Sequence, residues 1–230
     1  MFFRIIFCLG VAVLTSCSTA KMAMHPGLEV DSEKYKITER PRAFSGGDLV
    51  FGPYKATKIS RGFINSSGRF ISFGKHRAGK KKKGQDYTYQ FKGKSTWHGD
   101  CKAKKGNWEF GIISGGFHAD INCTFVPIDS GSTSASGWKF SIKGETSGTA
   151  TGSINIGSQT IKVTAINKIE GSSLAMDQYT GYYFYLRQTI IAGVDVISNE
   201  GPVWLNKKLS QDEKDIIAMV VVALLLNQTY

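Results

Sequence analysis

The chain has 230 residues and a formal net charge of +11, from 29 lysines and arginines against 18 aspartates and glutamates. This length suits one domain with a full hydrophobic core, and the positive charge favours an anionic partner. The HExxH, CxxC and G-x-S-x-G motifs are missing. The sequence therefore gives no support for the metal-site and hydrolase chemistry of those motifs, and we predict no metal and no cofactor.

The first residues are typical of an export signal. Arg4 supplies a positive start, and residues 5–14 are almost wholly apolar. An apolar run of about ten residues is too short to span a bilayer, which takes roughly 20. The run ends in the segment Leu14-Thr15-Ser16-Cys17, which places a cysteine where the apolar residues stop.

That segment resembles the lipobox of bacterial lipoproteins, in which signal peptidase cuts before the cysteine and the new N-terminal cysteine is acylated. The resemblance implies that residues 1–16 are a signal peptide and that Cys17 carries lipid. Ser18 is not the aspartate associated with retention in the inner membrane, so the resemblance implies the periplasmic face of the outer membrane. The alternative is an ordinary secretory signal that is cut at Ser18-Thr19-Ala20.

Loss of the signal peptide leaves 214 of the 230 residues, with 28 of the 29 basic residues against 18 acidic ones, a charge of +10. In a bacterial envelope we expect contact with the membrane through the lipid anchor. We also expect an anionic partner such as anionic lipid, lipopolysaccharide or an acidic cell-wall polymer. Nucleic acid is not expected, because an exported lipoprotein rarely meets it.

Residues 17–47 are predicted to form the lipidated cysteine and a flexible tether. They are mostly polar, lack a clear apolar period and contain Pro26 and Pro41. About thirty flexible residues span about 30 Å on average, enough to hold a domain clear of the bilayer. Residues 48–230 are then predicted to be a single β-rich domain.

From residue 49 onwards, short runs of aromatic and β-branched residues alternate with turn-forming residues. Such runs lie at residues 70–73, 87–91, 121–126, 138–142, 154–156, 160–166 and 182–191. They predict a mainly β fold, an antiparallel barrel or sandwich with one apolar C-terminal helix. Tyr87, Tyr89 and Phe91 recur every second residue, which predicts the core face of a strand. Residues 129–137 predict a mobile loop.

A basic run occupies residues 74–85, between two of these strands. Its glycine boundaries and its charge predict a hairpin loop that is too self-repulsive to fold inward. The candidate anion-binding residues are Lys75, Arg77, Lys80, Lys81, Lys82 and Lys83. The alternative is a solvated loop that only keeps the domain soluble.

Cys101 and Cys123 are the cysteines left once Cys8 is removed and Cys17 is acylated, and an even pair in an oxidising compartment predicts a disulfide. A hairpin with its turn at Gly115-Gly116 would place the two cysteines two strands apart in a simple meander. Second-neighbour strands are about 9.6 Å apart, which is too far for a disulfide. Either the strand order departs from a meander or both thiols are free, and we prefer the first explanation.

An H-x-D pattern occurs twice, as His98 with Asp100 and as His118 with Asp120. On a strand, residues two apart share a face, so each pair could offer metal ligands or orient an imidazole for base catalysis. We favour the alternative that these are solvent-facing strand and loop-end residues. Two short repeats in a turn-rich region arise easily by chance.

The end of the chain predicts a helix over residues 211–226. Ser210 and Glu213 form a capping-box signature, and residues 216–226 are apolar on every face. This apolar part extends about 16 Å, roughly half of a bilayer core, so we predict a helix that lines or plugs a barrel. The alternative, a helix lying in the membrane surface, lacks basic residues at its polar end.

The layout of many strands followed by a late apolar helix resembles the tubby-like barrel of the tubby and phospholipid-scramblase relatives. In that family a hydrophobic C-terminal helix runs through a closed β-barrel. The resemblance implies such a barrel here and assigns no functional residue.

Three functions remain in competition. The leading hypothesis is a non-catalytic outer-membrane lipoprotein that binds or organises an anionic envelope partner. The second is a lipid-handling β-barrel module, which requires an apolar cavity beside the helix. The third is an envelope hydrolase that uses His98 or His118, which requires histidine and aspartate side chains in one cleft.

Overall fold

The computed structural model describes residues 20–41, 46–74, 76–110, 113–128, 137–144, 149–176 and 178–227. Thirteen strands and two helices lie in this part of the chain. In chain order they are α1 (Pro26–Asp31), β1 (Ser32–Glu39), β2 (Leu49–Phe51), β3 (Tyr54–Arg61), β4 (Asn65–Phe73), β5 (His76–Lys92), β6 (Thr96–Phe110), β7 (Ile113–Pro127), β8 (Trp138–Gly144), β9 (Ala150–Ile156), β10 (Gln159–Ile166), β11 (Gly181–Leu186), β12 (Thr189–Asp195), β13 (Pro202–Asn206) and α2 (Gln211–Leu226).

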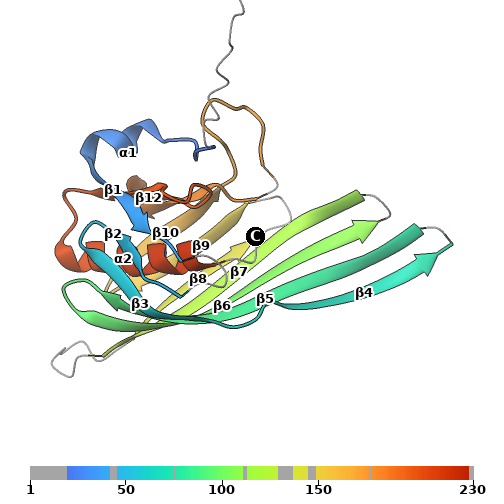
Figure 1. The fold of residues 1–230 in the computed structure, drawn as a ribbon. Coiled ribbons are helices and arrows are strands. Elements are labelled where there is room, and N and C mark those ends of the chain that lie inside the picture. The colour runs from blue at the N-terminus through green and yellow to red at the C-terminus, as the bar shows by residue number, and fades with distance from the viewer. Residues whose placement is uncertain are drawn as a thin grey trace, which may run out of the picture.

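The strands close into an antiparallel barrel (Figure 1). Neighbouring strands follow the order β3-β2-β1-β13-β12-β11-β10-β9-β8-β7-β6-β5, and β5 pairs with β3 to complete a ring of twelve. The remaining strand, β4, pairs with the other half of β5. The prediction of a mainly β antiparallel fold with one apolar C-terminal helix is therefore confirmed, with a barrel rather than a sandwich.

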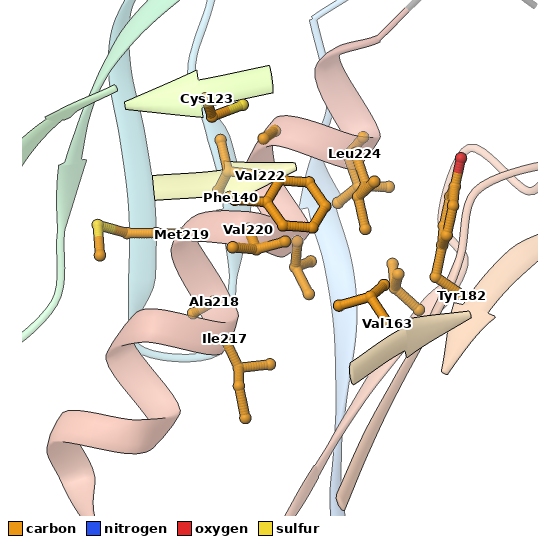
Figure 2. Packing of buried hydrophobic residues seen from close by; sticks show 14 of the residues in the cluster. Cys123, Phe140, Val163, Tyr182, Ile217, Ala218, Met219, Val220, Val222 and Leu224 are labelled. Carbon is orange, nitrogen blue, oxygen red and sulfur yellow. The ribbon is translucent and has the colours of Figure 1, made fainter. Parts of the chain in front are cut away.

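Helix α2 runs inside this ring (Figure 1). It begins with the predicted capping box, because the Ser210 hydroxyl accepts a hydrogen bond from the Glu213 backbone and the Glu213 carboxylate accepts one from the Ser210 backbone. Residues 216–226 are each at most 1% exposed. In Figure 2 the side chain of Met219, on the helix, points away from the side on which Val163 of strand β10 lies. Both residues belong to the same buried cluster, so the barrel wall contacts more than one side of the helix. The helix is plugged into the barrel, as its all-round apolar surface predicts.

The barrel wall also satisfies polar groups along the enclosed helix. The Tyr89 hydroxyl donates to the Met219 carbonyl at 2.6 Å, and the Tyr87 hydroxyl donates to the Ala223 carbonyl at 2.8 Å. Near the end of the helix the Leu225 carbonyl, which has no partner within the helix, accepts from the Arg40 guanidinium at 3.0 Å. Burial raises the pKa of the Tyr89 hydroxyl well above its ordinary value, so this group stays protonated as a donor.

The start of the helix is fixed through a buried carboxylate. Asp215 is 5% exposed and accepts a hydrogen bond from the Lys94 backbone at 2.7 Å. Gly93 makes this approach possible, since a Cβ at that position would lie 2.5 Å from the Asp215 carboxylate. The turn between β5 and β6 is therefore shaped to receive the first turn of α2.

The predicted tether is wrong over residues 22–39, which belong to the folded domain. Met22 and Leu28, the latter on α1, are buried against the outside of the barrel, and β1 is a barrel strand between β13 and β2. Within β1, the inward-facing Tyr35 and Ile37 alternate with lysines and a threonine. The strand was missed because only two apolar residues mark its period, and lysines surround them.

The predicted disulfide between Cys101 and Cys123 is confirmed, whereas the preferred explanation of its geometry is wrong. Strands β6 and β7 form one long hairpin, and their register places the two cysteines directly opposite each other. Gly115-Gly116 lies within β7 instead of forming the turn. The register of β6 and β7 shifts between Gly106 and Trp108, which accommodates the two glycines within the strand as an irregularity. The strand order is therefore a simple meander, and the two cysteines lie on adjacent strands.

Among the described residues, neither helix has the length and apolar character that a membrane crossing requires.

The enclosure of α2 predicts a large loss of stability when a charge enters it. Val221 is fully buried, so Val221→Asp places an unpaired carboxylate in an apolar interior and should cost at least about 3 kcal/mol or abolish folding. Leu174 is 74% exposed, and Leu174→Asp should change the unfolding free energy by less than about 0.5 kcal/mol. Urea unfolding followed by circular dichroism compares the two variants. Equal midpoints would contradict an enclosed helix.

Candidate functional site

Beyond the barrel, β4 and the distal parts of β5, β6 and β7 form a four-stranded sheet, which projects to the right in Figure 1. We name this sheet the basic arm and define it as residues 65–73, 76–84, 104–110 and 113–120. Its base lies where Gly84, Lys104 and Asp120 stand in one row. Eight of its residues are basic and two are acidic. The basic residues are Arg69, Arg77, Lys80, Lys81, Lys82, Lys83, Lys104 and Lys105.

The predicted hairpin loop of residues 74–85 is wrong for all but its first residues. The chain turns after β4 at Gly74, which has a φ of +59°, and β5 begins at His76. Lys80, Lys81, Lys82 and Lys83 are inside β5, paired with β4 on one side and β6 on the other. Charge repulsion does not prevent a strand here, because both faces of the arm lie outside the ring and the neighbouring strands supply the backbone hydrogen bonds.

The lysines of the basic arm are divided between its two faces. Tyr87 and Tyr89 face the barrel interior, so Lys81 and Lys83 share the face of the arm that continues the inner wall. Lys80 and Lys82 lie on the face that continues the outer wall, which we call the outer face, and both are exposed. The arm is consequently basic on both sides.

The register places like charges directly opposite one another. Arg69 on β4 is opposite Lys80, and Lys83 is opposite Lys105 on β6. Partial burial, and after it the charge of Lys83, lowers the pKa of Lys105. Like charges at directly opposite positions destabilise a sheet, so a bound anion between them would remove a repulsion as well as gain an attraction.

None of the ion pairs in the part of the chain that the structure describes involves Lys80, Lys81, Lys82 or Lys83. Asp120, one of the two acids of the arm, accepts a hydrogen bond from the Gly144 backbone at 3.3 Å. Among the described side chains, Lys80 to Lys83 therefore form no ion pair with an acid of the chain.

The remaining predicted site residues do not converge. Cys17 and Lys75 lie outside the described residues, and Arg77 is placed only through the backbone of β5. His98 stands opposite Val126 while His118 stands opposite Gly106, so eight residues of β7, about 27 Å, separate the two histidines. Over residues 20–227, with the stated gaps, no group of three or more His, Cys, Asp or Glu residues is arranged to hold a metal.

A second candidate site is a groove of about 840 Å³ on the outside of the barrel. It lies between the segment around Met22 and the strands that carry Lys36 and Trp204. Asp195, buried at its edge, accepts hydrogen bonds from the backbone of Met22 and of Ser198 at 3.0 Å each. The groove has both acidic and basic lining residues, including the ion pair of Lys36 with Glu200, so it carries little net charge.

Some residues of the basic arm and of the groove are not predicted from the sequence. Arg69, Lys104 and Lys105 belong to the arm, but they lie outside the lysine run and become its neighbours only through strand pairing. The groove is not predictable from the sequence, because its first lining residues, such as Met22, lie in the polar segment that predicts a tether. No protein family, curated protein or solved structure matches this chain.

Proposed function

We propose that this protein is a non-catalytic lipoprotein of the bacterial outer membrane that is anchored through Cys17 and binds an anionic envelope partner with its basic arm. The observation that carries the proposal is the pair of like-charge contacts, Arg69 opposite Lys80 and Lys83 opposite Lys105. A solvated surface has no need to concentrate cations in this way, whereas an anion-binding surface gains affinity from each of them.

The docked N-terminal segment supports a short connection between the lipid and the barrel. Ala20 accepts a hydrogen bond from the Ser198 hydroxyl at 3.3 Å, and Met22 is 2% exposed. Cys17 precedes Ala20 by three residues, which span at most about 10 Å of chain. A lipidated Cys17 would therefore hold the barrel wall against the bilayer rather than about 30 Å away.

The competing functions receive less support from the geometry. Helix α2 occupies the barrel interior and packs against its wall, while the described groove lies outside the barrel, which does not favour a lipid carried beside the helix. The hydrolase hypothesis requires histidine and aspartate in one cleft, and His98 is about 27 Å along the sheet from His118. Neither alternative has an observation of its own comparable to the charge of the arm.

Removal of the anchor cysteine tests the lipoprotein assignment. Cys17→Ala has no sulfur to acylate, so the variant should incorporate no labelled palmitate and should not be processed before residue 17. Metabolic labelling of cells that express the wild type and the variant gives the readout, with Cys8→Ala as the matched control that should label normally. Labelling of Cys17→Ala at the wild-type level would overturn the anchor.

Neutralisation of the arm tests anion binding. Each lysine near an anionic membrane surface contributes about 1 kcal/mol, so changing Lys80, Lys81, Lys82 and Lys83 to Gln should weaken binding to anionic vesicles by about 100-fold or more. Binding of the wild type should also fall steeply with salt, since the charges are exposed. Vesicle sedimentation uses the chain from Ser18, which lacks the lipid but retains every described residue.

A matched control removes the same charge elsewhere. Lys139, Lys143, Lys162 and Lys168 are exposed and lie outside the arm, and their change to Gln should cost much less binding. Equal losses in the two variants would mean that net charge, and not the arm, determines binding. Equal weak binding of the wild type to anionic and neutral vesicles would contradict the proposed function altogether.

A further inference from the structure

A short three-stranded ladder lies on the outside of the barrel, formed by the first described residues and the connection between β10 and β11 (Figure 1). Met22 pairs with Ile169, and Lys168 pairs with Ala175, both in antiparallel orientation. Backbone hydrogen bonds of 2.6 to 3.0 Å support the two pairings. The connection is therefore fixed to the segment of chain that leads back to Cys17.

The register brings the first described residue and a turn of the connection to the same end of this ladder. The chain runs back from Met22 to Ala20 in the direction in which the paired strand runs forward from Ile169, because the two are antiparallel. That strand ends in a turn at residues 170–173, which is closed by a hydrogen bond from the Ser172 amide to the Ile169 carbonyl at 3.1 Å. Ala20 and the turn thus lie together at one end of the ladder.

The connection presents exposed apolar side chains beside this end. We name residues 171–176 the exit loop. None of its residues is charged, and all of them are exposed. Leu174 is 74% exposed and Met176 is 38% exposed, and residues two apart in a strand share a face. Exposed apolar side chains that gather at one place mark a contact with a partner or a membrane.

We propose that the exit loop contacts the bilayer that holds the Cys17 lipid, with Leu174 at the boundary between headgroups and acyl chains. The inference rests on the lipid anchor of the proposed function and adds a membrane contact that is distinct from the basic arm. Cys17 is at most about 10 Å of chain from Ala20, so the end of the ladder that holds Ala20 stays close to the bilayer surface. Leu174 is two strands away from the segment of Ala20, about 10 Å. Interfacial segments bury their apolar face about 5 to 10 Å into this boundary, so the bilayer is within reach of Leu174.

The charges beside the exit loop do not require an anionic bilayer. Lys21 and Glu170 are neighbours in the ladder, since the Glu170 amide donates to the Lys21 carbonyl at 3.0 Å, and both side chains are exposed. Side chains of both signs can face the phosphate and the ammonium groups of zwitterionic lipids. The contact should therefore form on neutral phosphatidylcholine, which gives the basic arm no net electrostatic attraction.

A single fluorescent label measures the contact. In the processed protein, Cys17 is acylated and Cys101 and Cys123 are bridged, so Ser173→Cys provides one free thiol. In phosphatidylcholine vesicles that carry the lipidated protein, an environment-sensitive label there should emit at shorter wavelength than on the lipid-free chain. Nitroxides on the lipid acyl chains should also quench it. The same label at Phe63→Cys should show neither change, because Phe63 lies between β3 and β4 on the opposite side of the ring.

A charge on the exit loop should abolish the contact. Added to Ser173→Cys, Leu174→Asp places a carboxylate where the apolar side chain would enter the bilayer, so the wavelength shift and the quenching should both be lost. Phe63→Asp is the matched control, because it replaces an apolar side chain that is 88% exposed and should leave both signals unchanged. Both variants should keep the urea midpoint of the labelled parent, since neither residue is buried.

The outcomes distinguish the inference from the proposed function. Identical emission at position 173 in the lipidated and the lipid-free protein would overturn the contact and leave the anchor and the arm intact. A shift that persists in the Leu174→Asp variant would overturn the role of Leu174. Equal shifts at positions 173 and 63 would overturn the fixed orientation that the contact requires. Failure of the wild type to incorporate palmitate would overturn the anchor of the proposed function and the inference together.

Discussion

The enclosure of an all-apolar helix is the constraint on which the rest of the structure depends. Residues 216–226 carry apolar side chains on every face of the helix, so a sheet that covered only one face would leave the others in water. Only a wall on all sides removes that surface, and the ring from β3 round to β5 provides it. Tyr87, Tyr89 and Arg40 then supply donors to helix carbonyls where the apolar wall alone could not.

Helix α2 lies inside the barrel, and our proposals place partner binding on the outside of the molecule. The lumen that carries ligands in hollow barrels is occupied here by α2, and the wall that surrounds the helix is continuous with the basic arm. Strand β5 shows both roles in one segment: Tyr87 and Tyr89 contact the helix, while Lys80 to Lys83 belong to the arm. Our proposals therefore assign anchoring to Cys17, rigidity to the plugged barrel and partner contact to the arm.

Local signals in the sequence were sufficient for the C-terminal helix. Ser210 and Glu213 fixed its start, and the uninterrupted apolar run fixed its burial, because both effects act within a few residues. Non-local strand pairing accounts for the predictions that were wrong. The lysine run forms a strand only because it pairs with β4 and β6. The Gly115-Gly116 pair lies within β7 because β7 pairs with β6. Strand β1 pairs with β13, which comes from the far end of the chain. The candidate site depends on the same pairing, which brings Arg69 and Lys105 beside the run.

Native-state hydrogen exchange tests the central claim that the barrel closes around α2. If the helix is enclosed, the amides of residues 217–226 cannot exchange until the barrel opens, and their free energy of exchange should equal that of global unfolding. Amides of the arm, such as those of Lys80 and Lys82, should exchange through smaller openings with a lower free energy. Helix amides that exchange as readily as those of the arm would contradict the account, because α2 would then detach without unfolding the barrel.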